Sequence, residues 1–157
     1  MMYLSREERA EILAVQLKEN GLLSCETLKK ILGKEFIPLL VFRTNKLAPL
    51  EALVKYLKEE LSLSYHEIAV LTARNDRTIW KTYKNASKKE EKNDYSASEI
   101  FIPAEVFASR KLSILESLIS HLIEKKKLRM PKIASIIGKD NRMLWTIYAR
   151  AKKKRNK

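Results

Sequence analysis

The sequence is poor in the residues that form disulfides, tight turns and catalytic centres. Its 157 residues include one Cys, three Gly, four Pro and two His. The lone cysteine, Cys25, cannot form an intramolecular disulfide, which is typical of a protein from a reducing compartment. Scarce Gly and Pro, together with abundant Ala, Leu, Ile, Lys and Glu, favour helices over sheets. We therefore predict an all-α fold.

Long apolar runs and recognisable catalytic motifs are also missing. No run approaches the roughly 18 apolar residues that a membrane span needs, and charged side chains occupy positions 6 to 9, where a secretory segment would be apolar. His66, His121 and Cys25 have no usual zinc spacing, and no Gly-rich phosphate loop or nucleophile elbow is present. We expect a cytoplasmic protein that is not an enzyme, without metal, cofactor or membrane partner, and with both histidines on the surface.

The chain contains an internal repeat. The stretch 36–89 aligns without gaps with the stretch 101–154, which lies 65 residues later, and about two positions in five are identical. The repeated residues include Phe-Ile-Pro at Phe36 and Phe101, Arg77 and Arg142, Trp80 and Trp145, and Tyr83 and Tyr148. We predict two tandem modules, 36–89 and 101–157, joined by a polar linker over 90–100 that leaves them hinged.

Residues 1–35 form a separate segment. Ser5 and Glu8 form a capping-box pattern that predicts a helix from Ser5 to Asn20, Gly21 ends it, and a second helix follows Ser24. We interpret this segment as a surface for homodimerisation or for a protein partner. Its end, over 30–35, echoes 135–140, so a third copy that lacks its last helix is an alternative.

Within each copy, spacing and capping residues predict a series of short helices. Apolar residues recur at helical spacing from Leu50 to Leu61, and Ser64 with Glu67 opens a second helix. A last helix is expected over 76–89 and again over 141–155. Upstream, Ile-Pro at positions 37–38 and 102–103 is expected to start a short helix that carries the Val-Phe pairs 41–42 and 106–107 into the core.

The stretch from Glu67 to Ile79 resembles the helix-turn-helix of the promoter-recognition domain (region four) of bacterial sigma factors. Ala69 falls on the small position where the two helices cross, Ala73 and Gly138 on the turn, and Ile79 and Leu144 on the buried position of the recognition helix. The run 74–78 is also similar to the DNA-binding end of the bacterial replication initiator. Ala73 and Met143 depart from the usual Gly and Thr. The resemblance covers about 20 residues per copy and implies DNA binding through each last helix.

The charge supports an anionic partner. The net charge is +13, while residues 1–35 carry equal numbers of acidic and basic side chains, so the excess lies in the repeated part. With Ile79 and Tyr83 inward, the opposite side of the last helix is cationic. The predicted DNA-binding residues are Arg74, Asp76, Arg77, Trp80, Lys81, Lys84 and Lys88 in the first copy, and Lys139, Asn141, Arg142, Trp145, Thr146, Arg150 and Lys153 in the second.

Several of these positions have a second interpretation. Trp80 and Trp145 stack on sugar and phosphate or pack between helices, and packing is the preferred prediction. Tyr83 and Tyr148 are expected in the core with solvated hydroxyls. The tail 152–157 is interpreted as a disordered phosphate-binding arm, or else as a solubilising end.

We expect a double-stranded DNA-binding protein, either a transcriptional regulator or a nucleoid-organising protein, whose two modules enter neighbouring major grooves. Two rivals remain: an adaptor that docks proteins on its helix-turn-helix folds, and a binder of structured RNA.

Overall fold

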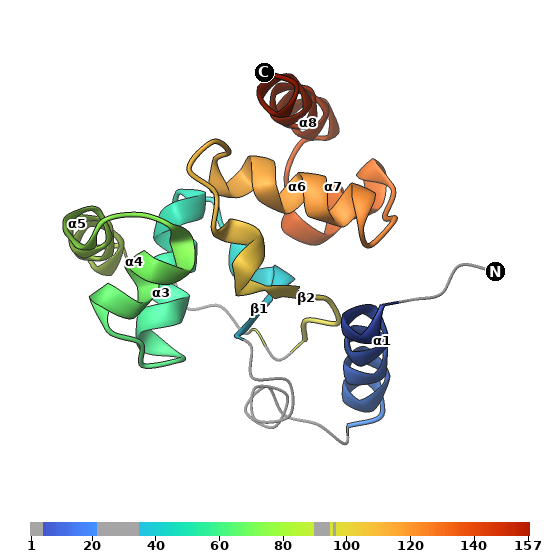
Figure 1. Cartoon of the computed structure of the whole chain (residues 1–157), viewed down its shortest axis with the longest axis horizontal. Coiled ribbons are helices and arrows are strands. Elements are labelled where there is room, and N and C mark those ends of the chain that lie inside the picture. Colours follow the sequence, from blue (N-terminus) through green and yellow to red (C-terminus); the bar gives the residue numbers. More distant parts are fainter. Residues whose placement is uncertain (1–4, 22–34, 90–94, 96) are drawn as a thin grey trace.

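The computed structural model describes residues 5–21, 35–89, 95 and 97–157, and this part of the chain is mostly helical (Figure 1). The first half, as we call residues 36–89, contains β1 and a 3₁₀ helix, followed by three α-helices. The second half, residues 101–157, repeats this order. The elements are α1 (Arg6–Glu19), β1 (Phe36–Pro38), η1 (Leu39–Phe42), α3 (Pro49–Glu59), α4 (Tyr65–Thr72), α5 (Asp76–Ser87), β2 (Phe101–Pro103), η2 (Ala104–Phe107), α6 (Ile114–Glu124), α7 (Met130–Ile137) and α8 (Asn141–Arg155).

The N-terminal helix forms where its capping residues predict it. The Ser5 backbone N–H donates to Glu8 Oε2 at 2.7 Å, and the Glu8 N–H donates to Ser5 Oγ at 3.1 Å, so the capping box is confirmed. Gly21, just beyond the helix, has a left-handed φ of 68°. Glu11 pairs with Lys126, which follows α6, at 3.2 Å. The expected second helix after Ser24, the 30–35 echo and Cys25 lie outside the described residues.

The Ile-Pro segments form strands and not the starts of helices, while the short helices expected there are present as 3₁₀ helices that begin directly after each proline. β1 and β2 pair in an antiparallel sheet with Ile37 opposite Ile102, and both isoleucines are fully buried. The 3₁₀ helices η1 and η2 follow and carry Phe42 and Phe107 into the core, with ring centroids 5.5 Å apart. The all-α expectation therefore describes most of the structure but missed this two-stranded sheet. Three-residue strands are too short to leave a periodic signal in the sequence.

The two halves share one hydrophobic core. η1 packs on α3 of its own half and on α7 of the other, and η2 packs likewise on α6 and α4. The buried side chains of both halves form a single cluster. The hinge expected from the polar stretch 90–100 does not fit this arrangement, because the sheet and the crossed 3₁₀ helices join the halves directly.

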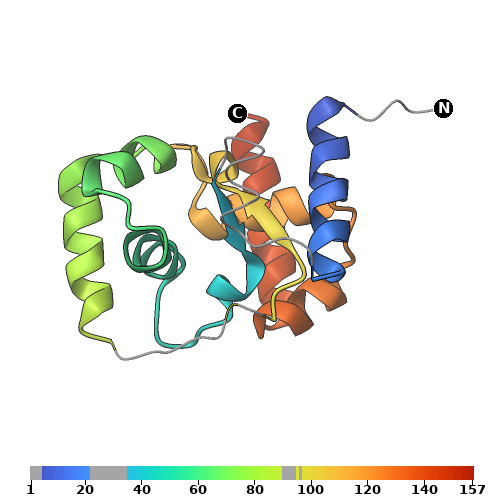
Figure 2. The ribbon, with the colours of Figure 1, turned by 90° about the horizontal axis from the view of Figure 1, so that it is seen from below.

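The last helix of each half lies on the outside of the molecule. In Figure 1, α5 lies at the left edge and α8 at the top, with α3, α4, α6 and α7 between them and the central sheet. Figure 2 shows α5 again along an outer edge and α1 at the opposite side of the molecule. Each outer helix is anchored by an inward apolar side chain, Ile79 in α5 and Leu144 in α8, both fully buried.

Candidate nucleic-acid interface

In the first half, a short helix and the outer helix meet at a left-handed turn. Ser64 caps α4 in a reciprocal capping box with Glu67. α4 ends at Ala73, whose φ of 54° and ψ of 41° are left-handed although it is not glycine. Asn75 then caps α5, accepting the Thr78 N–H at 2.8 Å. The turn is therefore built by one left-handed alanine, Ala73, and by the capping residue Asn75 that opens the next helix.

The second half repeats this geometry with different residues. Gly138 adopts a φ of 65° and a ψ of 37° at the end of α7. Asp140 caps α8 by accepting the N–H groups of Arg142 and Met143, at 2.8 and 3.2 Å. The sequence assigned the turn to Ala73 and Gly138, and the structure confirms that both residues occupy it.

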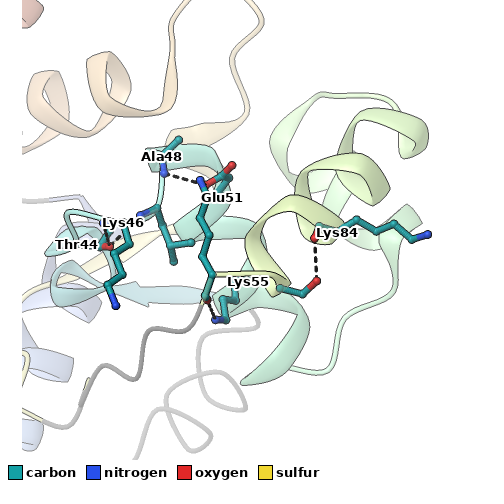
Figure 3. Close-up of polar contacts among 9 residues, drawn as sticks. Thr44, Lys46, Ala48, Glu51, Lys55 and Lys84 are labelled. Atoms are coloured by element: carbon teal, nitrogen blue, oxygen red, sulfur yellow. Dashed lines mark hydrogen bonds and ion pairs between the residues drawn. The ribbon is translucent and has the colours of Figure 1, made fainter.

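The side of α5 that faces away from the core is cationic and exposed. Most of the residues predicted for the first copy gather here, all exposed: Asp76, Arg77, Trp80, Lys81, Lys84 and Lys88. Lys84 Nζ lies 4.2 Å from the centroid of the Trp80 ring, and in Figure 3 its side chain extends away from Glu51 and Lys55. The carboxylate oxygen Oδ2 of Asp76 lies 3.1 Å from His66 Nδ1. This face therefore presents several unburied cations beside a flat aromatic ring.

The corresponding side of α8 carries most of the residues predicted for the second copy, with Arg150 at its edge, where it lines a hollow together with Glu116 and Arg74. Six of them are exposed: Asn141, Arg142, Trp145, Thr146, Arg150 and Lys153. The Thr146 hydroxyl donates to the carbonyl of Arg142 at 3.0 Å, so its proton is already used. The basic residues of α8 lie further toward its C-terminal end than those of α5.

Both tryptophans are on the surface, so the preferred prediction that they pack between helices is wrong. Trp80 is 44% exposed and Trp145 is 53% exposed. Trp145 contacts Tyr148, with ring centroids 6.3 Å apart. The buried positions are taken by Ile79 and Ala86 in α5 and by Leu144 and Ala151 in α8. A tryptophan with an open face is available for stacking.

Arg74 and Lys139, predicted as DNA contacts, are engaged inside the protein. Arg74 Nη1 donates to the carbonyls of Thr72 at 2.7 Å and of Phe107, in the other half, at 3.5 Å. Burial lowers the pKa of the Arg74 guanidinium from its usual value. Lys139 Nζ donates to the carbonyl of Thr44 in the first half at 2.8 Å. These residues occupy equivalent positions and join the halves.

Two arginines that sequence reasoning missed complete the same junction. Arg43 Nη1 donates to the carbonyls of Ser135 and Ile136 at the end of α7, both at 3.0 Å. Arg110 Nε donates to the carbonyl of Ala73 at the end of α4, at 3.2 Å. Cations favour helix C-terminal carbonyls. The partners lie far apart in the sequence, so no local signal marks these contacts.

Further polar contacts anchor the inner sides of the outer helices. Lys89 Nζ bonds Glu51 at 2.7 Å and Lys154 Nζ bonds Glu116 at 2.9 Å. Figure 3 shows Glu51 also accepting from the Ala48 N–H. Burial raises the pKa of Glu116, but the bond from Lys154 and the cap contact outweigh it, so the pKa lies below its usual value. Because Glu51 and Glu116 bind them, Lys89 and Lys154 do not belong to the cationic face.

One further carboxylate in each half, Glu59 or Glu124, accepts a bond from a tyrosine of the outer helix. Glu124 also binds the C-terminal tail. Tyr83 and Tyr148 pack against the core and are half-buried, so their prediction as core residues is confirmed in part. Their hydroxyls were expected to be solvated, but they donate to Glu59 and Glu124, at 3.3 and 3.2 Å. Arg155 also binds Glu124 with two bonds, at 2.7 and 2.6 Å. α8 continues to Arg155, so the interpretation of the tail as a disordered arm is wrong for this part.

The two histidines differ in burial. His66 is exposed, whereas His121 is half-buried in α6, so the surface prediction is wrong for His121. Burial, with a contribution from Lys126 and Lys125, lowers the pKa of His121 to about 4. Within the described ranges, no three His, Cys, Asp or Glu side chains gather as a metal site. No helix in the described part has the length and apolar character to cross a membrane.

Comparison with protein-family models, with curated proteins and with solved structures finds no match to this chain.

Proposed function

We propose that the protein binds double-stranded DNA without catalysing a reaction, and that α5 and α8 are the recognition helices of two helix-turn-helix units. The observation that carries this proposal is the pair Arg77 and Arg142. Both are exposed, both lie in the first turn of an outer helix, and both follow a left-handed turn that ends a shorter helix. In helix-turn-helix proteins the N-terminal part of the second helix reaches base edges in the major groove.

The side chains on each outer helix divide into two roles. Asp76, Arg77, Asn141 and Arg142 are at the N-terminal ends and would meet base edges, where Arg favours guanine and Asn favours adenine. The remaining basic residues would meet phosphates, and the exposed tryptophans would lie against the sugar-phosphate backbone. The phosphate contacts are Lys81, Lys84 and Lys88 in α5 and Arg150 and Lys153 in α8. Such a protein would act as a transcriptional regulator or organise the nucleoid.

The test is duplex binding, measured by fluorescence anisotropy between about 50 and 200 mM salt. We expect affinity to fall steeply with salt, by about 0.9 log units per log unit of salt for each phosphate neutralised. Arg77→Ala combined with Arg142→Ala should weaken binding about tenfold or more, because two base contacts are lost.

The matched control is Arg6→Ala combined with Lys127→Ala, which removes the same charge from exposed positions outside α5 and α8. It should bind within about twofold of the unmodified protein, since long-range charge alone is largely screened by salt. Equal weakening by both double variants, or an affinity that does not depend on salt, would contradict the proposal. Equal competition by duplex RNA would favour an RNA ligand, and capture of a protein from nuclease-treated extract, without duplex binding, would favour an adaptor.

A further inference from the structure

The central sheet pairs the two Phe-Ile-Pro segments of the repeat about their middle residues. Phe36 is opposite Pro103, Ile37 opposite Ile102, and Pro38 opposite Phe101. Ile37 therefore faces its own counterpart in the repeat, and the two outer Phe–Pro pairs are counterparts of each other. An antiparallel pair of this kind has a local twofold axis at its centre, between Ile37 and Ile102. A half-turn about that axis exchanges the strands and restores the same pairing.

The same symmetry extends beyond the strands. The Leu39 N–H donates to the Ile100 carbonyl, and the equivalent Ala104 N–H donates to the Glu35 carbonyl, both at 2.9 Å. η1 packs on α7 while η2 packs on α4, which is the exchange that a half-turn produces. Consecutive copies along the chain are therefore arranged in space like the subunits of a twofold dimer, and not like units translated along a line.

This symmetry sets the relative direction of the outer helices. Helices that lie perpendicular to a twofold axis run in opposite directions when a half-turn about that axis exchanges them. In Figure 2, α5 descends the left edge after α4, whereas the C-terminal end of α8 is near the top. DNA has its own twofold axes perpendicular to the duplex, and proteins with twofold-related recognition helices read two half-sites in inverted orientation.

We infer that the DNA site of this protein is an inverted repeat, read with one half-site by α5 and the other by α8. This inference rests on the proposed function and specifies its ligand. A direct repeat, which the tandem order in the chain suggests, would require copies related by translation. The two half-sites share the contact made by Arg77 and Arg142. They differ at one pair of equivalent positions. Asp76 in α5 can accept a hydrogen bond from cytosine, whereas Asn141 in α8 favours adenine. The palindrome is therefore imperfect.

The experiment is selection of bound sequences from a random duplex library, using the complete chain. We expect two inverted half-sites with centres about one helical turn apart, or about 10 base pairs. Arg77→Ala and Arg142→Ala, tested singly, should each erase the preference at one half-site and lower affinity for the selected sequence about tenfold. Arg6→Ala should leave both half-sites in place.

The possible outcomes distinguish failure of the inverted-repeat inference from failure of the proposed DNA binding. Retained duplexes that carry direct repeats, a single element or no common sequence would overturn the inverted arrangement while duplex binding stands. The same holds if each single variant degrades both half-sites. If no duplex is retained above the level of a library without protein, the proposed function itself fails, and the inference fails with it.

Discussion

Ala73 and Gly138 adopt the same left-handed conformation, with φ of 54° and 65°, at equivalent turns before the two outer helices. Left-handed backbone costs a residue with a Cβ roughly 1–2 kcal/mol. A Cβ added at Gly138 would meet Arg43 Cγ at 3.7 Å, an ordinary contact, so space is not the constraint there. The first half therefore contains backbone strain that the second half avoids.

Exchanging these residues should change stability in opposite directions. We expect Ala73→Gly to raise the free energy of unfolding by about 1 kcal/mol, and Gly138→Ala to lower it by a similar amount. Urea denaturation measures both. Ala108→Gly is the control, because Ala108 has a φ of −80° and gains nothing from glycine. A loss of stability in Ala73→Gly comparable with that control would show that the turn is not strained.

The shared core predicts that both halves unfold together. Trp80 lies in the first half and Trp145 in the second, so Trp80→Phe and Trp145→Phe leave one fluorescent reporter in each half. We expect the same denaturation midpoint from both reporters and from circular dichroism, since neither half can keep its core without the other. Two separated transitions would instead indicate independent modules.

Arg74 and Arg77, three residues apart, should respond differently to substitution. Arg74→Met leaves the carbonyls of Thr72 and Phe107 without their donor and should lower the free energy of unfolding by about 1–3 kcal/mol. Arg77→Ala changes an exposed side chain and should alter stability by no more than about 0.5 kcal/mol. Thermal and urea denaturation of the two variants measure the difference. Unchanged stability in Arg74→Met would show that these two bonds do not stabilise the junction between the halves.

The lowered pKa of His121 predicts that the protein loses stability in mild acid. Its pKa is about 4 in the folded protein, against an ordinary value of 6.5, so the unfolded chain binds the proton more readily between these values. The contribution of neutral His121 is complete above pH 6.5 and is lost as the pH falls toward 4. We expect a decrease of about 1–2 kcal/mol between pH 7 and pH 5.

The measurement is urea denaturation across this pH range for the unmodified protein, His121→Gln and the control His66→Gln, whose imidazole is exposed. His121→Gln should flatten the pH dependence, and His66→Gln should not. Carboxylates with lowered pKa values, such as Glu116, are common to all three proteins and cancel in the comparison. An identical slope for His121→Gln and the unmodified protein would contradict the assignment.

The sequence by itself determined most of the helices and the order in which they recur. Capping residues such as Ser5, Ser64 and Asn75 act on N–H groups two or three residues away, and apolar spacing from Leu50 to Leu61 reports one buried face. These signals are local, so helices were predicted close to their observed positions. The left-handed turn at Gly138 follows in the same way from one residue type, since glycine has no Cβ to oppose that conformation.

Only the tertiary structure decided how the two halves meet. The pairing of Ile37 with Ile102, and the bonds from Arg43, Arg74, Arg110 and Lys139 to distant carbonyls, join residues that composition and periodicity treat separately. Sequence placed Arg74 and Lys139 on the cationic face because charge alone does not reveal a carbonyl supplied by the other half. It also placed the tryptophans inside, since apolar area alone does not tell burial from exposure, and the inward positions of these helices are occupied by Ile79 and Leu144.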